Sequence, residues 1–71
     1  MTRRRVLGQP LTPREAQILR YIAQGSTNIA IAKALFTTEE DIRAHLSRAY
    51  RKLGARGRDH ATQIINQGKQ P

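Results

Sequence analysis

The stretch of sequence that decides the fold is residues 38–54, TEEDIRAHLSRAYRKLG. Its first residue, threonine, is a favoured helix N-cap, and Asp41 stands at the third helical position, where its backbone N–H can bond to the cap. Gly54 closes the stretch, at the place where a left-handed residue commonly ends a helix. The spacing of the apolar residues predicts a helix over residues 39–53. Its buried stripe consists of Ile42, Leu46, Ala49 and Leu53.

The opposite face of this helix carries mostly long polar side chains. It consists of Glu40, Arg43, Ala44, Ser47, Arg48 and Arg51. Acids lie in the first turn and arginines later, as the helix dipole favours. An α-helix fills the major groove of duplex DNA, where its exposed side chains contact the edges of the bases. We therefore expect base contacts from the first five residues of this face, and a phosphate contact from Arg51 near its end.

The first predicted helix of the chain has a clear start. Thr12 is an N-cap, Pro13 occupies the first helical position, and Glu15 completes a capping box. Gly25 ends this helix, because glycine enters the left-handed conformation at little cost. Its apolar residues at helical spacing are Ile18, Leu19 and Ile22.

Two more helices complete a predicted all-α fold of four helices. One begins after Ser26 or Thr27 and stops near Phe36, and the last covers residues 58–67. No stretch alternates apolar and polar residues for long enough to predict a strand. The expected organisation is a flexible basic arm (1–10), one helical domain (11–67) and a tail (68–71).

Composition narrows the classes of function. A chain of 71 residues and 8.0 kDa allows one small domain, and its formal charge of +8 favours a polyanionic partner. There is no cysteine, and His45 and His60 are far apart in sequence, so we expect no metal site, no cofactor and no catalysis. No apolar run approaches the ~18 residues of a membrane helix. We expect an intracellular, cytoplasmic protein with no membrane partner.

Two short helices joined by a tight turn, the second longer and basic outside, are typical of a helix-turn-helix. Around the reading helix we expect phosphate contacts from Thr27, Lys33, Thr38, His45, Arg51, Lys52, Arg56 and Arg58. The basic arm, Arg3-Arg4-Arg5, could add contacts or reach a minor groove. Two of these residues have another interpretation: Lys52 as an ordinary surface lysine, and His45 as a half-buried, hydrogen-bonded side chain. Tyr21 and Tyr50 are expected in the core rather than as a stacking platform.

Several motifs resemble the LuxR-type (GerE-like) helix-turn-helix domain. The opening Leu11-Thr12-Pro13-Arg14-Glu15 and the closing RKLGARGR of residues 51–58 carry the resemblance, which spans residues 11–65. It implies a four-helix domain whose third helix reads the major groove, in a bacterial or phage-encoded, nucleoid-associated transcription regulator. It also implies dimerisation through the fourth helix, with contacts from Ala61, Ile64 and Ile65. If the chain is complete, it resembles the small stand-alone members.

The sequence departs from this family at several contact-prone positions. Glu40 and Asp41 stand where the family usually has a Lys-Thr pair, and Ala44 where many relatives have a polar residue. Ile29 and Ala30 replace a common Lys-Glu pair. These departures keep one alternative open, a protein-interaction module on the same fold, which binds another regulator or RNA polymerase with weak or no specific DNA binding. The charge of +8 keeps a second one open, non-specific compaction of nucleic acid.

Overall fold

The computed structural model describes residues 10–68, and this part of the chain is all-α, with four helices and no strand. The helices are α1 (Pro13–Ala23), α2 (Asn28–Ala34), α3 (Glu39–Leu53) and α4 (Arg58–Gly68). The predicted fold class is confirmed, and α3 has the predicted bounds. Arg3, Arg4 and Arg5 of the predicted arm lie outside the described residues.

Three threonines begin the first three helices. In α1, Thr12 Oγ1 accepts from the Glu15 backbone N–H at 3.1 Å, and Glu15 Oε1 accepts from the Thr12 N–H at 3.0 Å. This is the predicted capping box. Thr27 and Thr38 cap α2 and α3 in the same way, each accepting from a backbone N–H at 3.1 Å. The sequence therefore fixes where each of these helices begins, through one hydroxyl per helix.

The helix ends use left-handed residues. Gly25, after α1, has a φ of 92°, and Gly54, after α3, has a φ of 73°, both as predicted. The turn after α2 uses Phe36 instead, with a φ of 57°. Across this turn the Thr37 N–H donates to the carbonyl of Ala32 at 2.9 Å. The tight turn between α2 and α3 thus depends on a bulky residue in a conformation that glycine adopts more easily.

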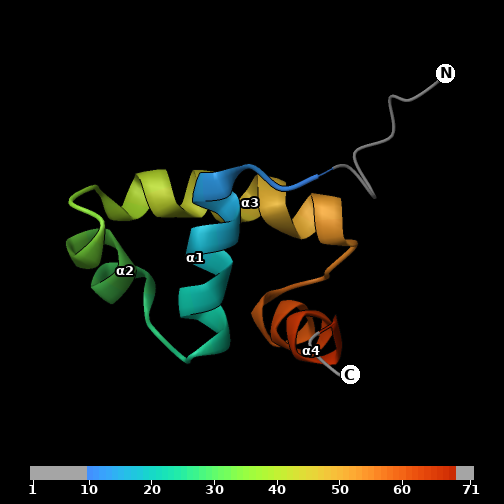
Figure 1. Cartoon of the computed structure of the whole chain (residues 1–71). Coiled ribbons are helices and arrows are strands. Elements are labelled where there is room, and N and C mark those ends of the chain that lie inside the picture. Colours follow the sequence, from blue (N-terminus) through green and yellow to red (C-terminus); the bar gives the residue numbers. More distant parts are fainter. Residues whose placement is uncertain (1–9, 69–71) are drawn as a thin grey trace, which may run out of the picture.

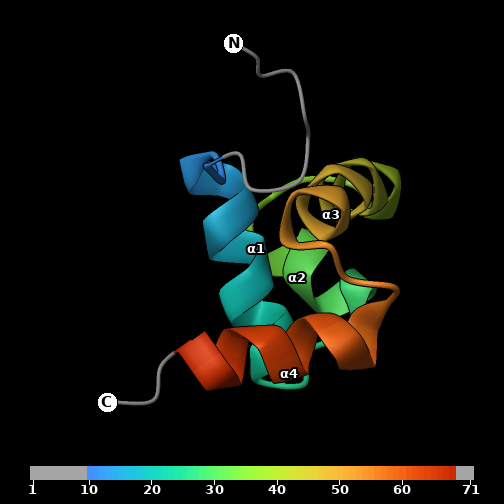
Figure 2. The same ribbon diagram turned by 90° about the vertical axis from the view of Figure 1, so that its right-hand side faces the viewer.

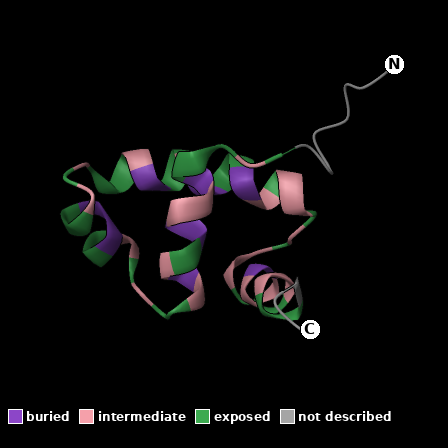
Figure 3. Ribbon diagram, in the orientation of Figure 1, coloured by how far each residue is buried: buried purple, intermediate pink, exposed green. Residues whose placement is uncertain are grey.

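The core forms where α1 meets the other helices. α1 packs against both α3 and α4, and α2 packs against α3. Figures 1 and 2 show α3 across the beginning of α1 and α4 across its end. The buried residues of this core, coloured purple in Figure 3, lie on α1, α2 and α3. They are Ile18, Leu19, Ile22, Ile31, Ala32, Ile42, Leu46 and Ala49.

Tyr21 and Tyr50 pack against this core cluster, as expected, and do not form a stacking platform. Burial raises the pKa of the Tyr50 phenol, although the charge of Arg58 acts in the opposite direction.

Among residues 10–68, no helix is long and apolar enough to cross a bilayer.

Candidate nucleic-acid interface

Six exposed side chains form a strip along α3 that we call the recognition face. They are Glu40, Arg43, Ala44, Ser47, Arg48 and Arg51. On the other side of the helix, Ile42, Leu46 and Ala49 are at most 4% exposed. Since these buried residues fix the rotation of α3 about its own axis, the recognition face is held outward. All five predicted base-contact residues lie on it.

The arginines of the recognition face differ in how they are held. Among residues 10–68, Arg43 and Arg51 have no side-chain hydrogen bond and no ion pair. Their guanidinium groups therefore keep all of their donors for an external acceptor. Arg48 is also exposed, with 52% of its side chain accessible, but it has two partners within the protein.

A chain of polar contacts runs along the flank of α3 toward α1. Thr37 Oγ1 donates to Asp41 Oδ2 at 2.9 Å, and the same oxygen lies 3.5 Å from His45 Nε2. His45 Nδ1 lies 3.4 Å from Arg48 Nη2. Arg48 Nε in turn lies 3.6 Å from Glu15 Oε2, on α1. These contacts make His45 a half-buried, hydrogen-bonded residue at the border of the recognition face.

Glu15 is the functional candidate that sequence reasoning missed. It is 1% exposed, and its Oε1 accepts from Lys52 Nζ at 2.8 Å as well as from the Thr12 N–H. Burial alone would raise the pKa of this carboxyl. The hydrogen bonds from Lys52 and Thr12, with the charges of Lys52 and Arg48, outweigh burial and hold the pKa of Glu15 below its ordinary value. Glu15 is therefore a fixed negative charge between α1 and α3.

A signal for this role was present in the sequence. Glu15 lies three, four and seven residues before Ile18, Leu19 and Ile22, so it falls on the buried stripe of α1. The capping box accounts for a glutamate at this position without any need for a second role. The spacing could not identify the partner of the Glu15 carboxylate, because Lys52 is 37 residues away in the sequence.

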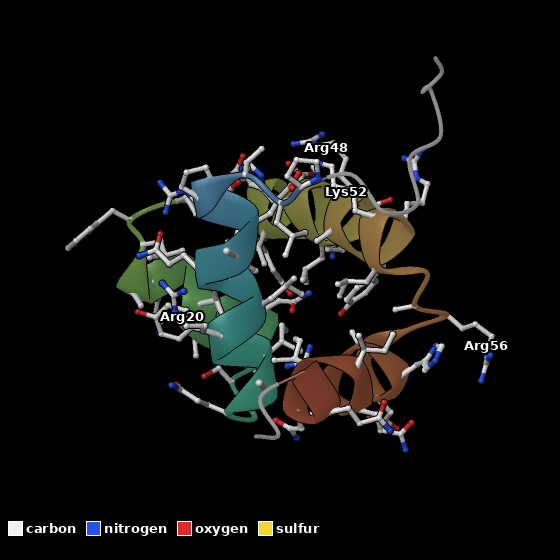
Figure 4. All side chains as sticks on the ribbon, turned by 45° about the vertical axis from the view of Figure 1, so that its right-hand side comes forward. Arg20, Arg48, Lys52 and Arg56 are labelled. Atoms are coloured by element: carbon white, nitrogen blue, oxygen red, sulfur yellow. The ribbon has the colours of Figure 1, made fainter. Side chains whose placement is uncertain are left out.

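Among residues 10–68, some of the predicted phosphate-contact residues have no side-chain partner, which we call free, and the others are engaged within the protein. Lys33, Arg51 and Arg56 are exposed, and Figure 4 shows Arg56 projecting from the connection between α3 and α4. The Lys52 side chain is only 14% exposed, and its ammonium is paired with Glu15. Figure 4 shows Lys52 and Arg48 on the side of α3 that lies near the start of α1. Lys52 therefore directs its charge into the protein.

Arg58 is engaged in a different way. It donates to Asn28 Oδ1 at 3.2 Å and to the backbone carbonyl of Ser26. These bonds join the beginning of α4 to the first residue of α2 and to the turn that precedes it. Thr27 and Thr38 use their hydroxyl oxygens as cap acceptors, but each hydroxyl retains its own O–H as a donor.

The three predicted dimer-contact residues of α4 do not share one environment. Ala61 is fully buried, and Ile65 packs against the core cluster. Ile64 is half-buried. Within a single copy, Ala61 and Ile65 therefore serve the domain's own core, and Ile64 is the side chain best placed to gain burial from a second copy.

Two large apolar side chains lie exposed in the helix-turn-helix, one at the beginning of α2 and the other in the turn after α2. Ile29 is 54% exposed and Phe36 is 96% exposed. The exposed acids Glu39 and Glu40 follow at the beginning of α3. In the part of the chain that the structure describes, no three His, Cys, Asp or Glu side chains are grouped to hold a metal ion.

The chain is similar to known regulators along most of its length. A family model described as bacterial regulatory proteins, luxR family, matches residues 9–65. The spore germination protein GerE of Bacillus subtilis (strain 168) is 37% identical over 60 residues, which cover 83% of this chain and 81% of GerE. The nitrate/nitrite response regulator protein NarL of Escherichia coli (strain K12) is 39% identical over 57 residues, covering 80% of this chain and 26% of NarL.

A third relative is the HTH-type quorum sensing-dependent transcriptional regulator RpaR of Rhodopseudomonas palustris (strain ATCC BAA-98 / CGA009). It is 47% identical over 51 residues, which cover 72% of this chain and 21% of RpaR. The chain thus spans most of the length of GerE, but only about a quarter or less of NarL and RpaR.

Proposed function

The chain belongs to the luxR family of bacterial regulatory proteins, and we propose that it regulates transcription by binding a specific sequence of double-stranded DNA. Membership of this family confirms the resemblance drawn from the motifs. Since the family consists of regulators, it also confirms the expectation that the chain is not an enzyme. α2 and α3 form the helix-turn-helix, and α3 lies in the major groove.

One observation carries this proposal: the recognition face is continuous, exposed and rich in arginine, on the second helix of the helix-turn-helix. Arg43 and Arg48 read base edges, for which the bidentate contact of arginine with guanine is the commonest specific pairing. Glu40 accepts a hydrogen bond from a cytosine amine, and Ser47 and Ala44 complete the contact surface. The acids of the first turn also stabilise the beginning of α3 through the helix dipole.

Phosphate contacts position the domain on the duplex without reading its sequence. The free cations Lys33, Arg51 and Arg56 are the strongest candidates, since they are exposed. Thr27 and Thr38 add hydroxyl donors, and His45 contributes from the border of the recognition face. Lys52 and Arg58 would have to give up internal partners to reach a phosphate, so they belong to the positioning of the helices rather than to the phosphate set.

Selection from a random pool of DNA duplexes tests the proposal directly. The wild-type chain should enrich one motif, and the preference for that motif over random duplex should persist as salt is raised. Phosphate contacts carry no sequence information, so a non-specific binder would lose all binding with salt and enrich nothing. An unenriched pool would contradict the proposal.

The regulator acts as a homodimer that pairs through α4, with Ile64 at the interface. Burial of a partly exposed isoleucine against a second copy stabilises the dimer, because apolar surface is removed from water. We expect Ile64→Glu to shift the chain to monomer in sedimentation and to abolish any two-fold symmetry in the selected motif. Gln63→Glu, at the exposed neighbouring position, is the matched control. A monomeric wild type, or an unchanged dimer in Ile64→Glu, would rule out this interface.

A regulator of transcription acts where the chromosome lies. The proposal therefore places the chain in the bacterial cytoplasm, in association with the nucleoid. Its macromolecular partner is double-stranded DNA, and it uses no cofactor in binding it.

A second candidate function, binding to another regulator or to RNA polymerase, is favoured by the exposure of Phe36. This side chain is 96% exposed, and it stands in a left-handed conformation where glycine would fit more easily. An outlier of this kind suggests a functional role for the side chain. Ile29 is exposed on the same helix-turn segment, and Glu39 and Glu40 provide an acidic edge.

Two variants separate this second candidate from DNA reading. Phe36→Gly should abolish binding to the protein partner and leave the selected DNA motif unchanged. Glu40→Lys combined with Asp41→Thr should create specific DNA binding only if the wild-type chain lacks it. If the wild type already enriches a motif and Phe36→Gly binds RNA polymerase as the wild type does, the second candidate is excluded.

A further inference from the structure

We infer that Glu15, on α1, is a positioning residue that sets the orientation of Arg48 on the recognition face and so contributes to base specificity. The inference rests on the proposed function, because it assumes that Arg48 contacts a base. Glu15 itself cannot contact DNA, since it is 1% exposed.

Two hydrogen bonds hold the Glu15 carboxylate in place. Its Oε1 accepts from Lys52 Nζ at 2.8 Å and from the Thr12 N–H at 3.0 Å. One of these partners comes from α3 and the other from the backbone of the cap of α1. With Oε1 bound on both sides and the side chain buried, Oε2 has a fixed position.

The other carboxylate oxygen of Glu15, Oε2, faces Arg48. Arg48 Nε lies 3.6 Å from Glu15 Oε2, and Arg48 Nη2 lies 3.4 Å from His45 Nδ1. A guanidinium carries five N–H donors in a rigid plane. Two of its nitrogens are thus directed toward internal partners, and the other end of the group is left for an external acceptor. Because the group is planar, holding it at two points fixes the direction in which the free end points.

The two cations paired with Glu15 are affected by it in different ways. Lys52 is 14% exposed, and its bond to Glu15 joins α1 to α3 inside the protein. The Arg48 side chain is 52% exposed, so solvent screens its pair with Glu15 and the pair adds little to stability. The effect of Glu15 on Arg48 is therefore mainly on orientation, whereas its effect on Lys52 is on folding.

Arg43 provides a built-in comparison. It lies on the same recognition face, and among residues 10–68 it has no side-chain partner. Its guanidinium must be ordered when DNA binds, whereas that of Arg48 is already oriented. A group that is oriented beforehand loses less conformational entropy on binding and discriminates more sharply between bases.

The test measures the relative affinity of each variant for the selected duplex and for duplexes with a single base pair changed. Arg48→Ala identifies the base pair that Arg48 reads. Glu15→Gln, which keeps the shape of the side chain and removes its charge, should then reduce the preference at that base pair by about fivefold, part of what a bidentate arginine contact provides. The preference at the base pair read by Arg43 should not change.

Two control variants separate positioning from a purely structural role. Ile22→Val removes one buried methyl group near the end of α1 without touching Glu15, so it should lower the melting temperature and leave the preference at the Arg48 base pair within about twofold of wild type. In an Arg48→Ala background, Glu15→Gln should change the base preference no further. A Glu15→Gln variant that loses stability but keeps the full preference at the Arg48 base pair would overturn the inference.

The outcomes also separate this inference from the proposed function. A wild-type chain that enriches no motif contradicts both. A specific wild type in which Arg48→Ala changes no base preference contradicts only the role of Arg48, and with it the inference. Should Glu15→Gln fail to fold, nuclear magnetic resonance of the wild type decides: the Nε–H of Arg48 should be more ordered than that of Arg43, and equal mobility would overturn the inference.

Discussion

A buried carboxylate is costly unless it is paired, and Glu15 is paired on both of its oxygens. It accepts from the backbone of its own helix cap and from Lys52 on α3, and it faces Arg48. One side chain therefore links the start of α1, the interior of the domain and the recognition face. A substitution at this position should alter stability and base preference through different partners.

The pH dependence of stability tests the charge of Glu15. Its pKa is lowered in the folded state, so the folded chain binds this proton more weakly than the unfolded chain. The stabilisation is present above the ordinary pKa and is lost as pH falls through the lowered one. Glu15→Gln should be about 2 kcal/mol less stable than wild type at neutral pH, because it leaves Lys52 without its charge partner.

That deficit should shrink as the pH falls below the ordinary carboxyl range, since protonation removes the same charge from the wild type. Urea unfolding of both proteins across this range measures it. Asp59→Asn, an exposed acid on α4, serves as the control and should show no comparable change. A Glu15→Gln deficit of the same size at every pH would contradict the assignment of charge to Glu15.

At the scale of elements, the turn between α2 and α3 decides how the two helices of the helix-turn-helix meet. Phe36 adopts a φ of 57° there, which costs an L-residue roughly 1–2 kcal/mol relative to its preferred conformations. Since its side chain is 96% exposed, little packing offsets that cost. Phe36→Gly should therefore be more stable than wild type by about 0.5–1 kcal/mol, after allowing for the greater entropy of glycine in the unfolded chain.

Thermal or urea unfolding measures this difference. Phe36→Ala is the matched control, because alanine removes the aromatic ring but keeps a Cβ in the left-handed region. It should gain no stability. If Phe36→Gly proves less stable than wild type, then the ring makes contacts that its exposure in the free chain does not reveal.

The ends of α1 and α3 show which parts of the fold can be predicted from local sequence. Thr12, Thr38 and Gly54 act within one turn of their own helix, so the bounds of α3 and the start of α1 followed from the sequence alone. The recognition face followed from helical periodicity in the same way. The left-handed Phe36 did not, because the residue type gives no signal for that conformation.

Long-range partners limited the prediction of the site. Lys52 and Arg58 are basic residues in a basic segment, and their sequence context favours phosphate contacts. The actual partner of Lys52 is Glu15, and those of Arg58 are Ser26 and Asn28; all lie 30 or more residues away along the chain. Only the packing of α1 and α4 shows that these charges are directed inward.

For the whole molecule, the charge of +8 should make DNA binding strongly dependent on salt. The logarithm of the affinity should fall with the logarithm of salt concentration, with a slope near −0.9 for each phosphate neutralised. Arg51→Ala and Arg56→Ala should each reduce the magnitude of that slope by about 1 and weaken binding to all duplexes alike.

Titrations with a fluorescent duplex at several salt concentrations measure this slope. Arg20→Ala is the control: Figure 4 shows Arg20 on α1, away from Arg48 and Lys52. It should leave the slope unchanged. If Arg20→Ala reduces the magnitude of the slope as much as Arg51→Ala does, then the net charge of the chain drives binding, whichever face carries the arginine.

Arg43→Ala tests whether the recognition face of α3 reads base pairs in the major groove. Arg43 is exposed on that face and has no partner among residues 10–68, so its loss should leave folding intact. Binding-site selection should be carried out with wild type and variant in parallel. We expect Arg43→Ala to lose the preference at one base pair per half-site, by about 1–3 kcal/mol, and to keep the rest of the motif. An unchanged motif in the folded variant would show that the recognition face does not read DNA through Arg43.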